Sequence, residues 1–161
     1  MLQEMLMAAQ MGCTLDPFVY HIDFAPATAS TTTTGQFLVQ SDAAFMILRT
    51  TAVVMSTTNA GVATLQPFGS GVDASLNPFL VTLMDQGAGR NLQSLPQNFD
   101  GIFGTAQKPY DWIVPKILDA NSAFTVTLQN LSATDRNVRL DFHGAKVFGN
   151  VAAFISKLKV Q

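Results

Sequence analysis

The sequence predicts an all-β protein that folds as a single antiparallel β-sandwich domain. Residues 124–129 and 138–143 each alternate strictly between apolar and polar side chains. Because successive side chains on a strand point to opposite faces, each run predicts a strand with one apolar and one polar face. Small polar residues, which favour turns, separate the apolar runs at the spacing of a sandwich or barrel. No convincing helical periodicity follows the N-terminal segment, so helices should contribute little to the fold.

Roughly eight or nine strands are expected along the chain. Residues 113–143 predict three consecutive antiparallel strands with their apolar side chains inside. The polar tract at 27–35 predicts a mobile loop or a solvated edge, and residues 98–104 predict a short strand or a bend. Residues 151–160 predict a last strand or a short amphipathic tail. The other predicted strands are residues 18–25, 36–40, 45–55, 62–68 and 79–85.

The N-terminal segment, residues 1–16, lacks this strand pattern and predicts an arm or a short helix, with the sandwich at 17–161. Methionine adapts to irregular partner surfaces, so Met5, Leu6 and Met11 are the expected anchors on a neighbouring subunit. The alternative is that the segment folds back as a lid over its own core. It has no basic start, so it is a poor signal peptide, and no run approaches the roughly 18 apolar residues of a membrane span.

Composition favours assembly with copies of the same chain. Only 12% of the 161 residues are charged, whereas about 25% is usual, and 48% are hydrophobic. A small chain of this kind often hides part of its surface in an oligomer, and we expect a homo-oligomer, with a trimer favoured. No basic cluster with interleaved aromatic residues is present, so nucleic-acid binding is not expected.

Few residues in the sequence suggest chemistry. His21 and His143 have no Cys, His or Glu at metal-ligand spacing, so a surface or interface position is expected for both. Cys13 has no basic neighbour to lower its pKa, which favours a buried or idle thiol. Arg49 interrupts an apolar run and should point to solvent or pair with a carboxylate at a subunit contact. We therefore expect no catalytic, cofactor-binding or metal-binding residues.

Tyr110 and Trp112 form the one candidate contact site for a ligand. They lie two residues apart and could stack on a sugar ring. The competing interpretation, which we favour, is that Trp112 begins a strand and anchors the core.

Several stretches together resemble small virion proteins of tailed bacteriophages. The pattern P-F-x-Y-x-I-x-F occupies residues 17–24, and FMILRTTAVV occupies 45–54. W-x-x-P-x-x-L-x-A-N-S follows at 112–122, N-L-S at 130–132, and R-L-x-F-H-G-x-K-V-F at 139–148. The resemblance covers most of residues 17–148 and carries no catalytic residue.

The resemblance implies a jelly-roll-like sandwich that decorates or cements the outside of the head and contacts the major capsid protein. It would be made in the host cytoplasm and end on the capsid exterior. A collar, adaptor or tail subunit is the nearest alternative. A carbohydrate-binding module that uses Tyr110 and Trp112 belongs to a different class, and an enzyme is the weakest hypothesis.

Overall fold

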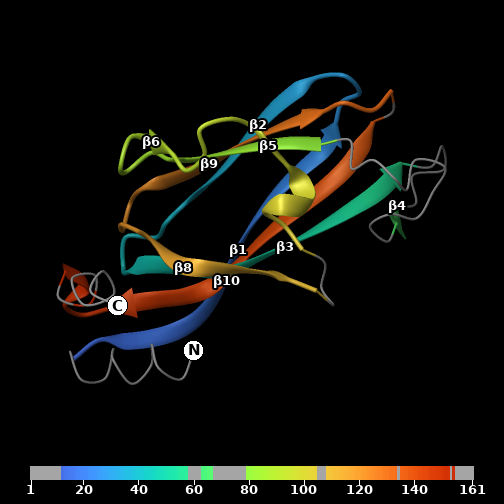
Figure 1. The fold of residues 1–161 in the computed structure, drawn as a ribbon. Helices are drawn as coiled ribbons and strands as arrows, with labels where there is room; N and C mark the ends of the chain where they lie inside the picture. Colours follow the sequence, from blue (N-terminus) through green and yellow to red (C-terminus); the bar gives the residue numbers. More distant parts are fainter. Residues whose placement is uncertain are drawn as a thin grey trace.

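The computed structural model describes residues 12–57, 63–66, 79–104, 108–133, 135–152 and 154. Two antiparallel sheets of five strands each pack face to face as a sandwich (Figure 1). Sheet A has the order β1-β10-β3, with β4 and β8 each paired to β3, and sheet B has the order β2-β9-β5, with β6 and β7 each paired to β5. The elements are β1 (Thr14–Ala27), β2 (Thr32–Leu38), β3 (Ala44–Thr57), β4 (Ala63–Gln66), β5 (Phe79–Asp85), β6 (Arg90–Asn91), β7 (Gln97–Asn98), the 3₁₀ helix η1 (Phe99–Gly101), β8 (Tyr110–Leu118), β9 (Ala123–Asn130) and β10 (Arg136–Phe148).

The principal strands cross repeatedly from one sheet to the other along the chain. β1, β3, β8 and β10 lie in sheet A, while β2, β5 and β9 lie in sheet B, and β6 and β7 share the place beside β5. This is the two-sheet arrangement of a jelly roll, with β4 as an added strand on β3. The predicted all-β sandwich is confirmed.

Several predicted strands lie close to their observed positions, and β5 matches residues 79–85 at both ends. β1 begins at Thr14, so Pro17 lies inside the strand and not at its start. Part of the polar tract at 27–35 belongs to β2, which is an edge of sheet B, so the solvated-edge alternative holds for that part. At the C-terminal end, Val151 and Ala152 are helical and not extended.

The three strands expected in succession over residues 113–143 exist but are not neighbours. β8 pairs with β3, β9 pairs with β2 and β5, and β10 pairs with β1 and β3. The apolar side of each strand, which the alternation predicts, is compatible with any of these partners. The pairing is decided by contacts between distant parts of the chain.

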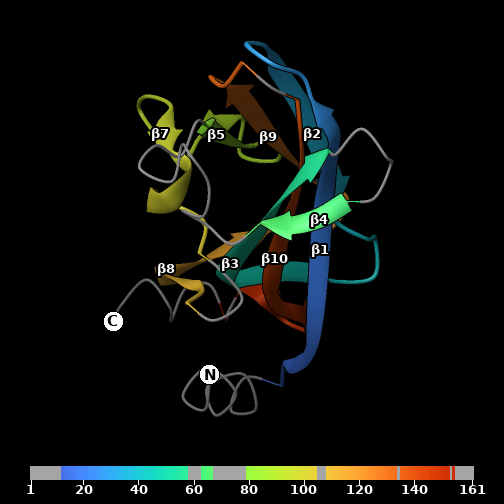
Figure 2. The same ribbon diagram turned by 90° about the vertical axis from the view of Figure 1, so that its right-hand side faces the viewer.

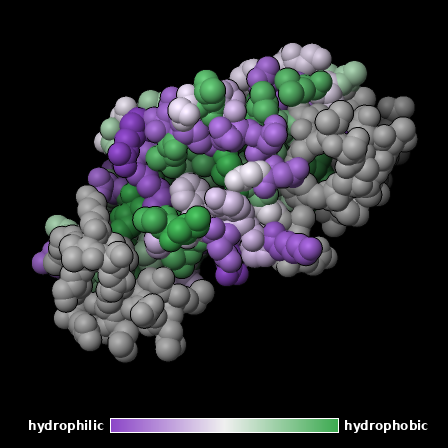
Figure 3. Space-filling view, in the orientation of Figure 1, coloured by the Kyte–Doolittle hydropathy of each residue, from purple (hydrophilic) through white to green (hydrophobic). Residues whose placement is uncertain are grey.

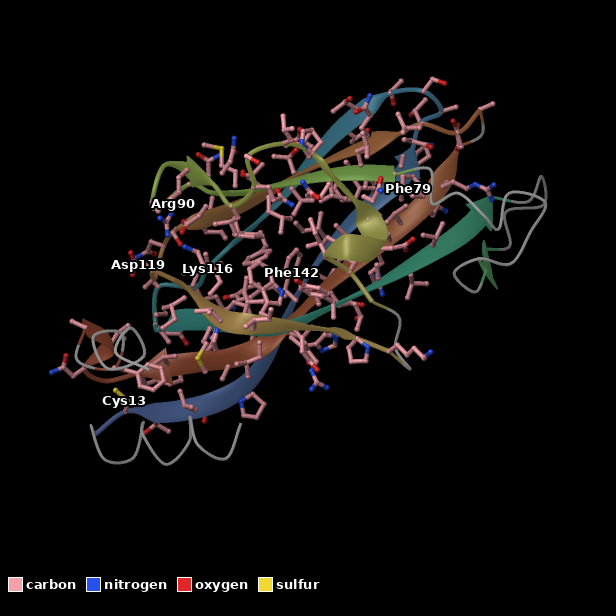
Figure 4. The ribbon with its side chains drawn as sticks, viewed as in Figure 1. Cys13, Phe79, Arg90, Lys116, Asp119 and Phe142 are labelled. Atoms are coloured by element: carbon pink, nitrogen blue, oxygen red, sulfur yellow. The ribbon has the colours of Figure 1, made fainter. Side chains whose placement is uncertain are left out.

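Phenylalanine rings fill the space between the sheets. Phe142 of sheet A is fully buried, and its ring centroid lies 5.2 Å from that of Phe37 and 5.4 Å from that of Phe124, both in sheet B (Figure 4). Phe103 meets the same ring edge-on at 5.7 Å. Such offset and edge-to-face pairs add about 0.5–1.5 kcal/mol each beyond the area they bury.

A bulge at Leu48 changes which side chains of β3 face the core. His143 pairs with Arg49 and Gly144 with Ile47, so Leu48 has no partner in β10. Before the bulge the odd-numbered Phe45 and Ile47 belong to the main core, and after it the even-numbered Ala52 does. A Cβ on Gly144 would lie 1.8 Å from the Met46 carbonyl oxygen, so this close approach of two strands requires glycine.

A second apolar cluster lies on the other face of sheet A, beyond the bulge. It contains the buried thiol of Cys13, as expected, and is covered by Phe154 from the helical turn after β10 (Figure 4). Its buried members are Cys13, Ala44, Met46, Ala145, Val147 and Phe154.

No helix in the described part of the chain is long and apolar enough to span a membrane.

We expect Phe142→Ala to lower the free energy of unfolding by about 3–5 kcal/mol, because it leaves a cavity between the two sheets. Urea unfolding followed by circular dichroism measures this loss. Val19→Thr, a β-branched replacement at an exposed position of β1, should change the free energy by less than about 0.5 kcal/mol. Equal effects of the two changes would contradict the assignment of Phe142 to the centre of the core.

Candidate functional site

Strand β8 separates from its neighbour β3 in the middle of its length. Pairing joins Ile47 to Lys116 at one end and Arg49 to Asp111 at the other. Residues 112–115 therefore lie opposite the single residue Leu48, and the strand bulges outward. Pro115 lies in this bulge, where its missing N–H group is not needed for a ladder bond.

The bulge exposes apolar side chains to solvent. Ile113 is 94% exposed and Val114 is 72% exposed, although isoleucine and valine are among the residues most often buried. Figure 3 shows apolar side chains gathered over this part of the molecule. An apolar patch of this kind on a small domain is typical of a contact site.

A pocket of about 210 Å³ opens beside the bulge, between β8 of sheet A and the β5 side of sheet B. An engineered cavity of roughly 150 Å³ binds benzene, so this pocket can hold one ring or one large side chain. Its walls are almost entirely apolar or aromatic. The lining residues are Leu83, Leu92, Gln93, Ile102, Tyr110, Trp112, Ile113 and Val114.

Gln93 supplies a polar group inside this apolar lining. Its Oε1 accepts a hydrogen bond from the Leu83 N–H at 2.7 Å. Its Nε2 is buried and has no hydrogen-bond partner among the described residues. An unpaired buried donor costs about 1–3 kcal/mol.

Trp112 both anchors the core and lines the pocket. Its Nε1–H donates to Thr50 Oγ1 at 3.4 Å, and Thr50 Oγ1 donates to the Ile102 carbonyl oxygen at 2.5 Å. The indole packs against the main core, while Tyr110, which is 36% exposed, lies at the rim. Trp112 therefore anchors the core, and it lines the pocket together with Tyr110, while contact of either residue with a sugar ring stays a prediction.

A buried ion pair ties β8 to the opposite sheet just beyond the bulge. Lys116 Nζ lies 2.5 Å from Asp85 Oδ2 on β5, and both side chains are largely shielded from solvent (Figure 4). Burial alone raises the pKa of Asp85, but the Lys116 ammonium and the N–H groups of Ala88 and Gly87 outweigh it. The pKa of Asp85 is consequently below its ordinary value. The pair joins β8 of sheet A to β5 of sheet B, two strands that contribute residues to the pocket.

The other candidate residues lie away from the pocket. His21 is exposed on β1, and His143 on β10 contacts Thr51 Oγ1 through Nε2 at 2.9 Å. Arg49 pairs with Asp111 of the same chain at 3.1 Å. Among the described residues, no group of three or more His, Cys, Asp or Glu side chains could hold a metal ion. Met5, Leu6 and Met11 lie outside the described residues.

Three of the eight residues that line the pocket could not be recognised from the sequence. Gln93 and Leu92 lie in none of the predicted strands, and Ile102 lies in a stretch predicted as a short strand or a bend. Only tertiary packing places them against Trp112.

The fold and the site together define a class, a jelly-roll β-sandwich with an exposed apolar surface at one edge. Comparison with protein-family models, with curated proteins and with solved structures finds no match to this chain. No relative therefore identifies it as a phage protein, and that part of the resemblance remains a prediction.

We expect Lys116→Met to destabilise the protein by about 1–3 kcal/mol at neutral pH, because Asp85 would remain buried without its counter-ion. Since the folded-state pKa of Asp85 is lowered, its ionised form stabilises the fold above the ordinary value of 3.8. That contribution is lost as the pH falls below this value. The difference between wild type and variant in urea unfolding should therefore shrink in acid.

Arg139→Met is the matched control for this ion pair. Arg139 pairs with Asp23 at 2.7 Å, but about half of its side chain is exposed. Solvent screening limits such a pair to less than about 1 kcal/mol. A larger loss of unfolding free energy in Arg139→Met than in Lys116→Met would contradict the structural role given to the buried Lys116–Asp85 pair.

Binding in the pocket can be followed through Trp112, which is the only tryptophan of the chain. A ligand that stacks on the indole or excludes water from it should shift or quench its fluorescence.

Proposed function

We propose that this chain is a structural subunit that assembles with copies of itself and decorates the head of a tailed bacteriophage. The observation that carries the proposal is the exposed apolar surface of the β8 bulge, where Ile113 and Val114 face solvent beside the pocket. This surface is suited to a protein partner, which in the proposed setting is the major capsid protein.

The physical gain from such a contact is burial of apolar area. Each Å² removed from water contributes roughly 25 cal/mol before the costs of association. A subunit that lies across the boundary between capsid subunits would stabilise the shell in this way. The low charge content of 12% agrees with a chain that works inside an assembly.

The fold is compatible with the proposal, because jelly rolls occur in viral capsid domains. The same fold serves many unrelated functions, so this agreement is an analogy. The phage setting rests on the sequence patterns at 17–24, 45–54 and 112–148. A collar, adaptor or tail position would use the same contact surface.

A carbohydrate-binding module is the second candidate, and the pocket is the observation that favours it. Trp112 and Tyr110 line the pocket with aromatic rings, which are suited to stacking on a sugar ring. Jelly rolls also occur in lectins. Titration of Trp112 fluorescence with monosaccharides and bacterial polysaccharides separates the two functions, since a decoration protein should give no saturable response.

We expect Ile113→Ser to reduce binding of the chain to heads of the phage that encodes it by at least about 10-fold, because it removes a large apolar side chain from the contact. Cosedimentation with purified heads that lack the protein measures the change. Val19→Ser, which alters an exposed apolar residue on the outer face of sheet A, is the matched control and should bind normally. Absence of the chain from purified virions would overturn the phage proposal.

A further inference from the structure

The outer edge of sheet B, formed by β2, has unpaired main-chain groups. β2 pairs with β9 on one side only. The Asn130 N–H bonds to the Thr31 carbonyl, and the Val39 N–H bonds to the Ser122 carbonyl, which fixes the phase of the ladder. Odd-numbered residues of β2 therefore bond to β9, and even-numbered residues direct their N–H and C=O groups outward. No described residue bonds to these outward main-chain groups, which belong to Thr32, Thr34, Gln36 and Leu38.

Among the described residues, this edge lacks the features by which proteins prevent unwanted strand pairing. Native edge strands are usually blocked by charged side chains, proline, bulges or a covering loop. β2 has the sequence TTTGQFL, and its pairing with β9 is regular over all seven residues. It contains no charge and no proline, and the uncharged stretch runs from residue 24 to residue 41. Threonine favours extended structure, so the edge is well suited to accept a further strand.

The edge of sheet A on the same side of the sandwich provides the contrast. β1 lies along β2 there (Figure 2). Its free edge carries Pro17, Pro26, Asp16 and Asp23, which are the protective features that β2 lacks. The β1 edge is thus protected against pairing with a further strand, whereas the adjacent β2 edge is not.

The outer face of sheet B next to β2 is also uncharged. Thr34, Thr127 and Thr82 form one row across β2, β9 and β5, with Thr34 Oγ1 3.4 Å from Thr127 Oγ1. A second copy of the same surface would therefore meet no like-charge repulsion, and no charge is present to select a partner of opposite sign.

We propose that β2 pairs antiparallel with β2 of a second copy about a two-fold axis at Gly35. This register places Thr34 opposite the partner's Gln36, and Thr32 opposite the partner's Leu38. It uses the outward groups of all four even-numbered residues, and an antiparallel strand is complementary to itself in this way. Leu38, which is 62% exposed in the single chain, becomes part of the contact.

The contact joins sheet B of both copies into one continuous sheet. It rests on the self-assembly part of the proposed function and assigns the surface that performs it, away from the β8 bulge. Because the contact is isologous, it produces a dimer, and the trimer favoured by the sequence would need a second, different contact.

Two substitutions test the β2 edge. Gln36→Pro removes an outward N–H and leaves the bonds to β9 in place, since Gln36 does not bond to that strand. Thr34→Lys adds one positive charge from each copy beside the axis. Light scattering after size exclusion should give about twice 17.3 kDa for the wild type and about 17.3 kDa for either variant at the same micromolar concentration.

Thr82→Lys is the matched control, because it adds the same charge to the same row of sheet B on β5, away from the edge. This variant should remain dimeric. Circular dichroism and the urea midpoint verify that each variant is folded. If Gln36→Pro unfolds the protein, the oligomeric state of Thr34→Lys alone tests the β2 pairing.

Hydrogen exchange on the wild type gives an independent readout. The amides of Thr34 and Gln36 should be protected in the dimer and exchange rapidly when dilution produces monomer. A wild-type monomer, rapid exchange at these amides in an oligomer, or an oligomer unaffected by a folded edge variant would each overturn the proposal. An oligomer that assembles through another contact would contradict the β2 pairing and remain consistent with the proposed function. A dimer that forms through β2 but does not bind phage heads would contradict only the phage assignment.

Discussion

The contact between Phe142 of sheet A and Phe37 and Phe124 of sheet B is the interaction on which the rest of the structure depends. These rings come from β2, β9 and β10, of which β2 is far from the other two in sequence, and Phe142 lies in the middle of the sandwich (Figure 4). Because each sheet has an apolar face that must be buried, this packing determines the separation and alignment of the two layers. The free edges, the β8 bulge and the pocket all derive their positions from that alignment.

Two irregularities in strand pairing turn a regular sandwich into a molecule with distinct surfaces. At Leu48 the bulge in β3 keeps the core-facing side chains inward on both halves of a long strand, and it produces the second apolar cluster on the outer face. Opposite the same residue, β8 bulges away and exposes Ile113 and Val114. The buried Lys116–Asp85 pair then joins β8 to sheet B directly after this bulge.

The proposed function uses two separate regions of the protein surface. The β8 bulge offers apolar side chains to a partner of complementary shape, whereas the β2 edge offers main-chain groups to a copy of itself. These interactions differ in physical kind, because one depends on burial of apolar area and the other on directional hydrogen bonds. A chain with little charge can use both, since neither surface requires ionic complementarity.

The sequence by itself determined the strands and their inward faces, because side-chain alternation is a local property with a period of two residues. The burial of Phe124, Val126 and Leu128 follows from that pattern, whereas the limits of β5 follow from a short apolar run between loop residues. The tertiary structure alone decided which strands pair, that β2 has a free edge, that Gln93 lies against Trp112, and that Lys116 meets Asp85 across the sheets. These features join residues far apart in the chain, and an alternating strand can satisfy its apolar face with any of several partners.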